Sequence, residues 1–82
     1  MNTRQWVDSI PEIHRSNLET YSNLIVQAMK HGRELECVEY AKLLRGYLTC
    51  MKACEIITES GLKALYLWYR SSRVTALISE DA

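Results

Sequence analysis

The stretch LECVEYAKLLRGYLTCMKAC, residues 35–54, contains no proline, and its apolar side chains recur every three or four positions. This spacing predicts an amphipathic helix. Two adjacent apolar lines run along it and make a face wider than one partner helix covers. The first line consists of Tyr40, Leu44, Tyr47, Met51 and Cys54, and the second of Cys37, Ala41, Leu44, Leu48 and Met51. Gly46 lies in mid-helix, where we expect it to permit close packing by a neighbouring helix.

Upstream of this stretch, residues 10–31 are expected to form a first long helix. Ser9 and Glu12 have the spacing of a capping box, in which each side chain accepts a backbone N–H of the other residue. Apolar residues then recur at three and four up to Met29. Gly32 suits the left-handed position that ends many helices. A short charged stretch, residues 33–36, connects this helix to the second one and overlaps its start, since the second helix is expected over residues 34–60. Because the connection is so short, the two helices are expected to form an antiparallel hairpin.

The ends of the chain extend this single all-α domain of 82 residues. Residues 1–9 are an N-terminal arm, expected to form one helical turn capped by Asn2 or Thr3, or to lay Trp6 against the body of the protein. Three glycines, one proline and no phenylalanine favour helices over a turn-rich β fold.

Residues 61–79 are expected to be a C-terminal helical extension. Between Leu62 and Tyr69 only Lys63 is polar, so this segment is apolar around its whole circumference, which a single packing face cannot hide. Either it folds back as a third helix buried on two sides, or another chain covers it. The pattern leaves open whether the second helix continues through Gly61.

Charge and hydropathy exclude several classes of protein. Ten Lys and Arg against ten Asp and Glu give no net charge, which argues against a nucleic-acid binder driven by a basic surplus. Four cations do share a polar strip: Lys42, Arg45, Lys52 and Lys63. Glutamates occupy the same predicted helix, so we interpret the strip as a solvated face of mixed charge. No apolar run approaches the roughly 20 residues of a membrane span, and the N-terminus has no signal-peptide core, so a cytoplasmic location is expected.

The cysteines and histidines indicate no site of chemistry. Cys37, Cys50 and Cys54 are expected to be buried free thiols, because an odd number without a secretory signal does not suggest a disulfide framework. Zinc-ligand spacing is missing, and His14 and His31 are expected to be exposed helix residues. No nucleophile–base pattern or Gly-rich phosphate loop is present, so we predict neither an enzyme nor a cofactor.

The wide apolar face and the aromatic cluster after Gly61 instead indicate binding to another protein, or to a second copy of the chain. Tyrosine and tryptophan are typical anchors of such interfaces. The predicted partner-binding residues are Tyr40, Leu44, Tyr47, Leu62, Leu65, Tyr66, Trp68 and Tyr69.

Over about residues 16–80, the layout of a first helix, a tight charged turn and a longer second helix ending in aromatics resembles the small helical-hairpin co-chaperones of type III secretion needle subunits. The likeness is carried by Glu39-Tyr40, Leu43-Leu44, Trp68-Tyr69-Arg70 and the tail Ala76–Glu80. The resemblance implies a cytoplasmic chaperone whose hairpin binds a TPR-like second chaperone, the pair keeping the needle subunit monomeric. The alternative interpretation is a small phage- or plasmid-type regulator that inhibits a host protein or binds nucleic acid.

Overall fold

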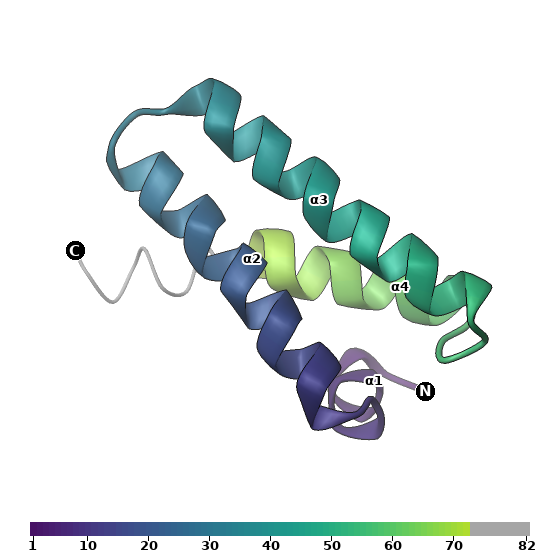
Figure 1. Ribbon diagram of the computed structural model, residues 1–82. Helices are drawn as coiled ribbons and strands as arrows, with labels where there is room; N and C mark the ends of the chain where they lie inside the picture. Colours follow the sequence, from purple (N-terminus) through teal and green to yellow (C-terminus); the bar gives the residue numbers. More distant parts are fainter. Residues whose placement is uncertain (73–82) are drawn as a thin grey trace.

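Helices make up almost all of residues 1–72, the part of the chain that the computed structural model describes. In order they are α1 (Thr3–Ser9), α2 (Glu12–Lys30), α3 (Glu34–Ala53), α4 (Glu59–Leu67) and the short π-helix η1 (Trp68–Ser72) (Figure 1). These residues contain no strand, which confirms the all-α class. The last part of the predicted C-terminal extension, residues 73–79, and the tail Ala76–Glu80 lie outside the described residues.

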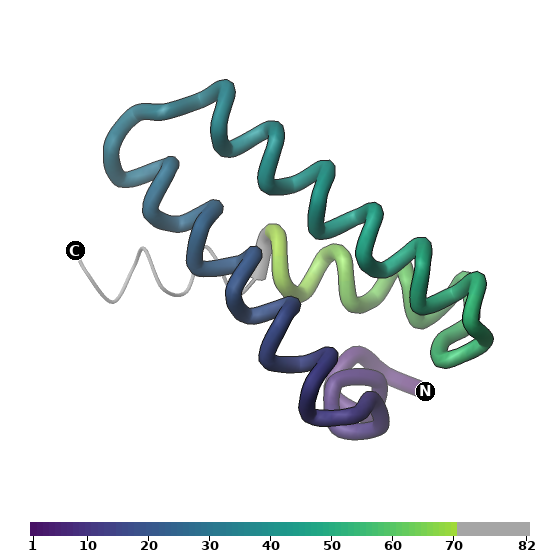
Figure 2. Tube along the Cα trace, viewed as in Figure 1, coloured from purple at the N-terminus to yellow at the C-terminus, as the bar shows by residue number. Residues whose placement is uncertain are grey.

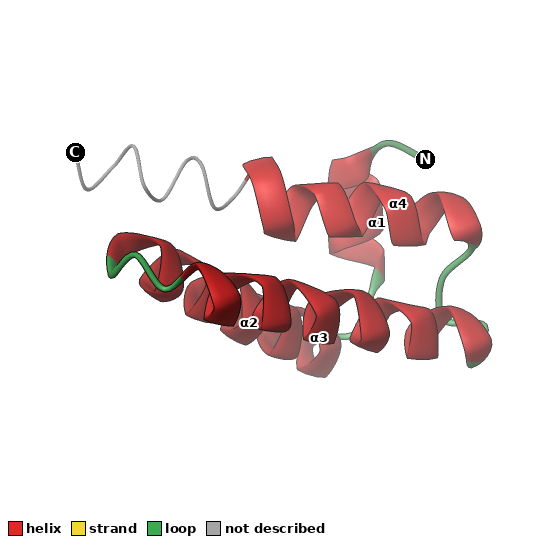
Figure 3. Cartoon of the chain, turned by 90° about the horizontal axis from the view of Figure 1, so that it is seen from above, coloured by secondary structure: helices red, strands yellow, loops and turns green. Residues whose placement is uncertain are grey.

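The helices form two layers. The two long helices, α2 and α3, pack against each other and form one layer, and α1 and α4 lie together on one side of that pair (Figure 3). No helix among residues 1–72 has the length and apolar character that crossing a bilayer requires.

The turn between α2 and α3 follows the sequence prediction. Gly32 has a φ of 66°, the left-handed conformation that glycine adopts without a steric penalty. The backbone N–H of Arg33 donates to the carbonyl of Ala28 at 2.8 Å, which closes the helix end in the manner of a Schellman motif. The observed α2 is therefore only slightly shorter than the predicted helix over residues 10–31.

The predicted second helix, residues 34–60, is wrong in its last quarter, because α3 ends at Ala53. Glu55 has a φ of 62°, and the N–H of Ile56 donates to the carbonyl of Met51 at 2.9 Å. This is the same helix ending as at Gly32, built with a glutamate in the left-handed position, which costs about 1–2 kcal/mol. Ile57, in the loop, is 4% exposed. Its burial is enough to offset that cost, since burying an isoleucine side chain contributes about 1.5–3 kcal/mol.

The chain then turns sharply into α4, as the trace in Figure 2 shows. Thr58 is the N-cap, and its hydroxyl accepts the N–H of Gly61 at 3.3 Å. Gly61 therefore lies in the first turn of a new helix rather than at the end of the old one. Of the two alternatives for this segment, the structure shows the first: it folds back and becomes part of the core.

The first residues form a helix of two turns, longer than the single turn predicted. Asn2 caps it as expected, and Asn2 and Gln5 exchange side-chain and backbone hydrogen bonds of 2.9 and 2.7 Å. The capping box predicted from Ser9 is wrong, because Ser9 belongs to α1 and its hydroxyl donates to the carbonyl of Trp6 at 2.9 Å. Pro11 precedes α2 without a side-chain cap.

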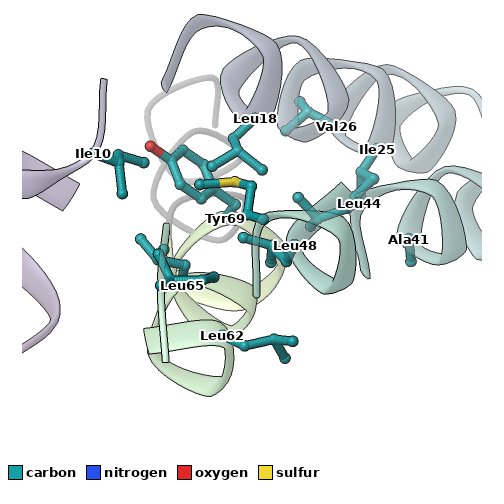
Figure 4. Close-up of a cluster of buried hydrophobic side chains, with 12 residues drawn as sticks. Ile10, Leu18, Ile25, Val26, Ala41, Leu44, Leu48, Leu62, Leu65 and Tyr69 are labelled. Atoms are coloured by element: carbon teal, nitrogen blue, oxygen red, sulfur yellow. The ribbon is translucent and has the colours of Figure 1, made fainter. Parts of the chain in front are cut away.

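The core lies between the two layers (Figure 4). Its most deeply buried large side chains are Leu18 and Ile25 of α2, Leu44 and Leu48 of α3, and Leu65 and Tyr69. Ser22 is the one fully buried polar side chain among the described residues, and its hydroxyl donates to the carbonyl oxygen of Tyr69 at 2.9 Å. This bond satisfies the serine and fixes η1 against α2.

Candidate binding groove

The eight predicted partner-binding residues separate into two groups. Four belong to the chain's own core, with exposures between 0 and 5%: Leu44, Leu62, Leu65 and Tyr69. For these four the prediction is corrected, because the reversal after α3 packs α4 and η1 against the long helices and leaves these side chains no surface to offer. The other four are only partly buried: Tyr40, Tyr47, Tyr66 and Trp68.

An apolar groove with a volume of about 580 Å³ runs along α2 and α3. Neither α1 nor α4 contributes to it, so it lies on a part of the first layer that the second layer leaves uncovered. Its size is within the range of about 300–1,000 Å³ that is typical of binding sites. Its lining residues are His14, Tyr21, Lys42, Leu43, Gly46, Tyr47, Cys50, Met51, Cys54 and Ile56.

Tyr47 of α3 is held in place by three residues of α2. Its hydroxyl accepts a hydrogen bond from Asn17 Nδ2 at 2.8 Å and lies 2.7 Å from His14 Nδ1. In the tautomer of His14 with its proton on Nε2, Nδ1 accepts the hydroxyl proton of Tyr47, so the hydroxyl both accepts and donates a hydrogen bond. The ring centroids of His14 and Tyr21 lie 5.7 and 5.9 Å from that of Tyr47, within the range of favourable aromatic pairs. Contacts within the protein therefore hold this side of the groove in place. The prediction that His14 is an exposed residue is wrong.

Gly46 opens the neighbouring wall. An added Cβ at this position would meet no atom within 4 Å, so within the described chain no helix packs closely here and that prediction is wrong. A glycine in mid-helix costs about 1 kcal/mol relative to alanine, and no contact within the described residues explains its presence. Two large apolar side chains lie beside this opening with substantial exposure, Leu43 at 52% and Ile56 at 37%.

The groove carries little charge. Lys42 is the one residue in its described lining with a formal charge, and its ammonium lies 3.7 Å from the carboxylate of Glu39. Both side chains are about 70% exposed, so this pair is worth at most about 1 kcal/mol and opens readily.

The thiols are not buried as predicted. Cys50 and Cys54 are exposed free thiols at the groove, and Cys37 is partly buried elsewhere. Cys50 lies in the last turn of α3, and Cys54 follows the last residue of that helix. Among residues 1–72, no group of three or more His, Cys, Asp and Glu side chains is placed to hold a metal ion.

Of the residues predicted from the sequence to bind a partner, Tyr47 is the one that lines the groove. A usable signal existed, because Leu43, Tyr47, Cys50 and Cys54 recur at intervals of four, three and four residues. This line shares Tyr47 and Cys54 with the line through Tyr40 and differs from it by including Leu43 and Cys50. His14 carries no comparable signal, since its role depends on how α2 is rotated against α3.

No family model matches the chain, and no curated protein or solved structure matches it significantly. The class of protein is therefore defined by its own geometry: a small all-helical domain with a complete core and an open apolar groove.

Proposed function

We propose that this protein binds another protein by accepting an amphipathic helix in the groove of the α2–α3 antiparallel hairpin. The observation that carries the proposal is that the groove is open and apolar, with Tyr47 held in place by α2, although the chain completes its core without a partner. Helix-in-groove binding uses a surface of this kind, because a few large apolar anchors supply most of the binding energy.

The dimensions of the groove suit a helix. Its lining on α3 and the following loop begins at Lys42 and reaches Cys54, which corresponds to about 18 Å or roughly three helical turns. The absent side chain of Gly46 allows a partner backbone to approach α3 closely, as small residues do wherever helices pack at short range. Leu43 and Ile56 then contact the apolar stripe of the partner, and Lys42 exchanges Glu39 for a carboxylate on the partner.

The proposed role within a cell follows from the resemblance to needle-subunit co-chaperones of type III secretion. In that family a helical hairpin binds a TPR-like chaperone, whose surface is itself made of helices. We propose a cytoplasmic adaptor or chaperone of this kind, which acts with a TPR-like partner to protect a needle subunit. What supports this is the hairpin layout together with the open apolar groove on it. The role is one of binding and requires no catalytic group.

The test blocks the groove without weakening the fold. Gly46→Leu places a side chain in open space and replaces a mid-helix glycine, so the variant should be at least as stable as the wild type. Leu43→Asp places a charge at the apolar rim, and Leu35→Asp, at a residue that is 84% exposed and outside the groove, is the matched control.

Each variant is purified from the native host, and the retained proteins are quantified by mass spectrometry. We expect a helical partner with the wild type and with Leu35→Asp, and its loss with both groove variants at unchanged thermal stability. NMR shifts of Tyr47 and Leu43 on addition of the isolated partner helix should then locate the contact. Equal retention by Gly46→Leu and the wild type would contradict the proposal.

A further inference from the structure

A second surface, away from the groove, gathers positive charge where α3 and α4 meet. We call it the basic face; it consists of the cations Arg45, Lys52, Lys63 and Arg70, together with Glu59 and Tyr66. The guanidinium carbons of Arg45 and Arg70 lie 5.5 and 5.9 Å from the centroid of the Tyr66 ring. Both are within cation–π distance, so two arginines from different helices are ordered on one aromatic side chain.

The reversal after α3 creates this face. Lys52 forms an ion pair with Glu59, and seven residues earlier on α3 Arg45 contacts Tyr66, so α4 runs back along α3. The polar strip that was expected on one continuous helix therefore lies on two neighbouring helices, with Arg45 and Lys52 on α3 and Lys63 on α4. Most glutamates expected to neutralise that strip lie outside the face: Glu34, Glu36 and Glu39 are in the first two turns of α3.

The charges of the basic face are not balanced locally. The face carries four cations and one carboxylate, and Arg45, Lys63 and Arg70 form no ion pair with any residue of 1–72. Lys52, through a hydrogen bond and its charge, lowers the pKa of Glu59, and the charges of Lys63 and Arg45 act in the same direction. Three of the cations therefore converge on this single carboxylate. Since the whole chain has no net charge, the surplus is a local property of this face.

We infer that the basic face binds an acidic segment of a partner protein, one in which carboxylates alternate with apolar side chains. A guanidinium already ordered on an aromatic ring loses little conformational entropy on binding, and its planar N–H donors match a carboxylate in a bidentate pair. Leu67, which is 59% exposed, is four residues after Lys63 and three before Arg70, so it lies on the same side of α4 and offers the apolar contact.

Two other polyanions fit this surface less well. Single-stranded nucleic acid is held by aromatic rings that stack on bases, whereas two guanidiniums already occupy the surroundings of the Tyr66 ring. An anionic membrane requires a broad apolar face between the cations, and within α4 Leu67 is the one large apolar side chain that is strongly exposed. A partner segment of mixed acidic and apolar character requires neither a free aromatic ring for stacking nor a broad apolar face.

Fluorescence anisotropy with a labelled peptide of repeated Glu-Glu-Leu units tests the inference at low ionic strength. The wild type should bind it, and a Gln-Gln-Leu peptide should not bind. Arg45→Gln with Arg70→Gln should weaken binding about tenfold or more, whereas Glu59→Gln, which removes the competing carboxylate, should strengthen it. The control, Arg4→Gln with Arg33→Gln, changes the charge equally at residues that are 74% and 61% exposed, and should have less than about a twofold effect.

The outcomes separate this inference from the alternatives and from the groove. Tighter binding of an oligo(dT) strand or of phosphatidylglycerol vesicles than of the Glu-Glu-Leu peptide would overturn the inference. An equal loss of peptide affinity in the control pair would also overturn it, and so would the absence of peptide binding at about 1 mM. Gly46→Leu should leave peptide binding unchanged, so failure of the groove proposal and failure of this one are distinguishable. All substituted side chains are exposed, and circular dichroism verifies that each variant is folded.

Discussion

Replacing Gly61 by alanine tests how α1 is fixed to α4. A Cβ at Gly61 would lie 2.9 Å from both Cε3 and Cζ3 of the Trp6 ring, well inside the 3.5–4.0 Å, approximately, at which carbon atoms make favourable contact. Alanine in a helix is worth about 1 kcal/mol over glycine, but overpacking of this kind costs about 1–3 kcal/mol. Gly61→Ala should therefore lower the free energy of unfolding by about 1 kcal/mol rather than raise it.

The tryptophan is the cause of that loss, so its removal should reverse the sign. In a Trp6→Ala background the clash is absent, and Gly61→Ala should stabilise by about 1 kcal/mol through helix propensity alone. The two effects differ by about 2 kcal/mol, the interaction energy of the double-mutant cycle. Because α1 contains no fully buried residue, Trp6→Ala should leave the other helices folded.

Urea denaturation followed by circular dichroism measures all four free energies of unfolding. Gly46→Ala is the matched control, since its new Cβ meets nothing and should stabilise by about 1 kcal/mol in both backgrounds. If Gly61→Ala stabilises the wild type as much as the Trp6→Ala variant, the packing of Trp6 on α4 is refuted.

Two further predictions concern α4. Leu65 has no exposed surface, so Leu65→Ala should lower the free energy of unfolding by about 2–5 kcal/mol. Leu67 is exposed, so Leu67→Ala should change it by less than about 0.5 kcal/mol. Equal shifts of the melting temperature in the two variants would contradict the burial of Leu65. Lys52 lowers the pKa of Glu59, so the stabilisation from this pair is present at neutral pH and is lost as acidification protonates the carboxylate. The stability difference between the wild type and Glu59→Gln should accordingly shrink when the pH falls below the ordinary pKa range of a carboxyl group. A difference that does not depend on pH would count against the pair.

The elements that sequence reasoning located correctly are those whose geometry depends on residue type alone. Apolar spacing located α2 to within two residues at its start and one at its end. Gly32 identified the turn because only glycine adopts a positive φ without a penalty. Asn2 was one of two candidates for the cap of α1, and short-range chemistry of this kind is readable without a tertiary structure.

The break after α3 was missed because a glutamate, not a glycine, occupies its left-handed position. Glutamate has no preference for this conformation that a sequence could reveal. The energetic cost of the left-handed conformation is offset only in the folded protein, where Ile57 is buried. The pattern instead continued the helix to residue 60 and set Gly61 as the possible break. Leu62, Leu65 and Tyr69 were consequently assigned to a partner, although tertiary packing places them in the core.

The same break explains why this small chain has two separate exposed surfaces, the groove and the basic face. A continuous helix would have left one wide apolar face for a partner to cover, whereas the reversal covers part of that face with α4 and leaves the groove. The reversal also brings Lys63 and Arg70 beside Arg45. Gly46 and Arg45 are adjacent in sequence, but adjacent residues on a helix point about 100° apart, so the groove and the basic face lie on different sides of α3. A substitution in one should therefore not disturb the other. If both proposals hold, we expect a partner with an apolar helix and an acidic segment to bind α3 from two directions, with a higher affinity than either contact provides alone.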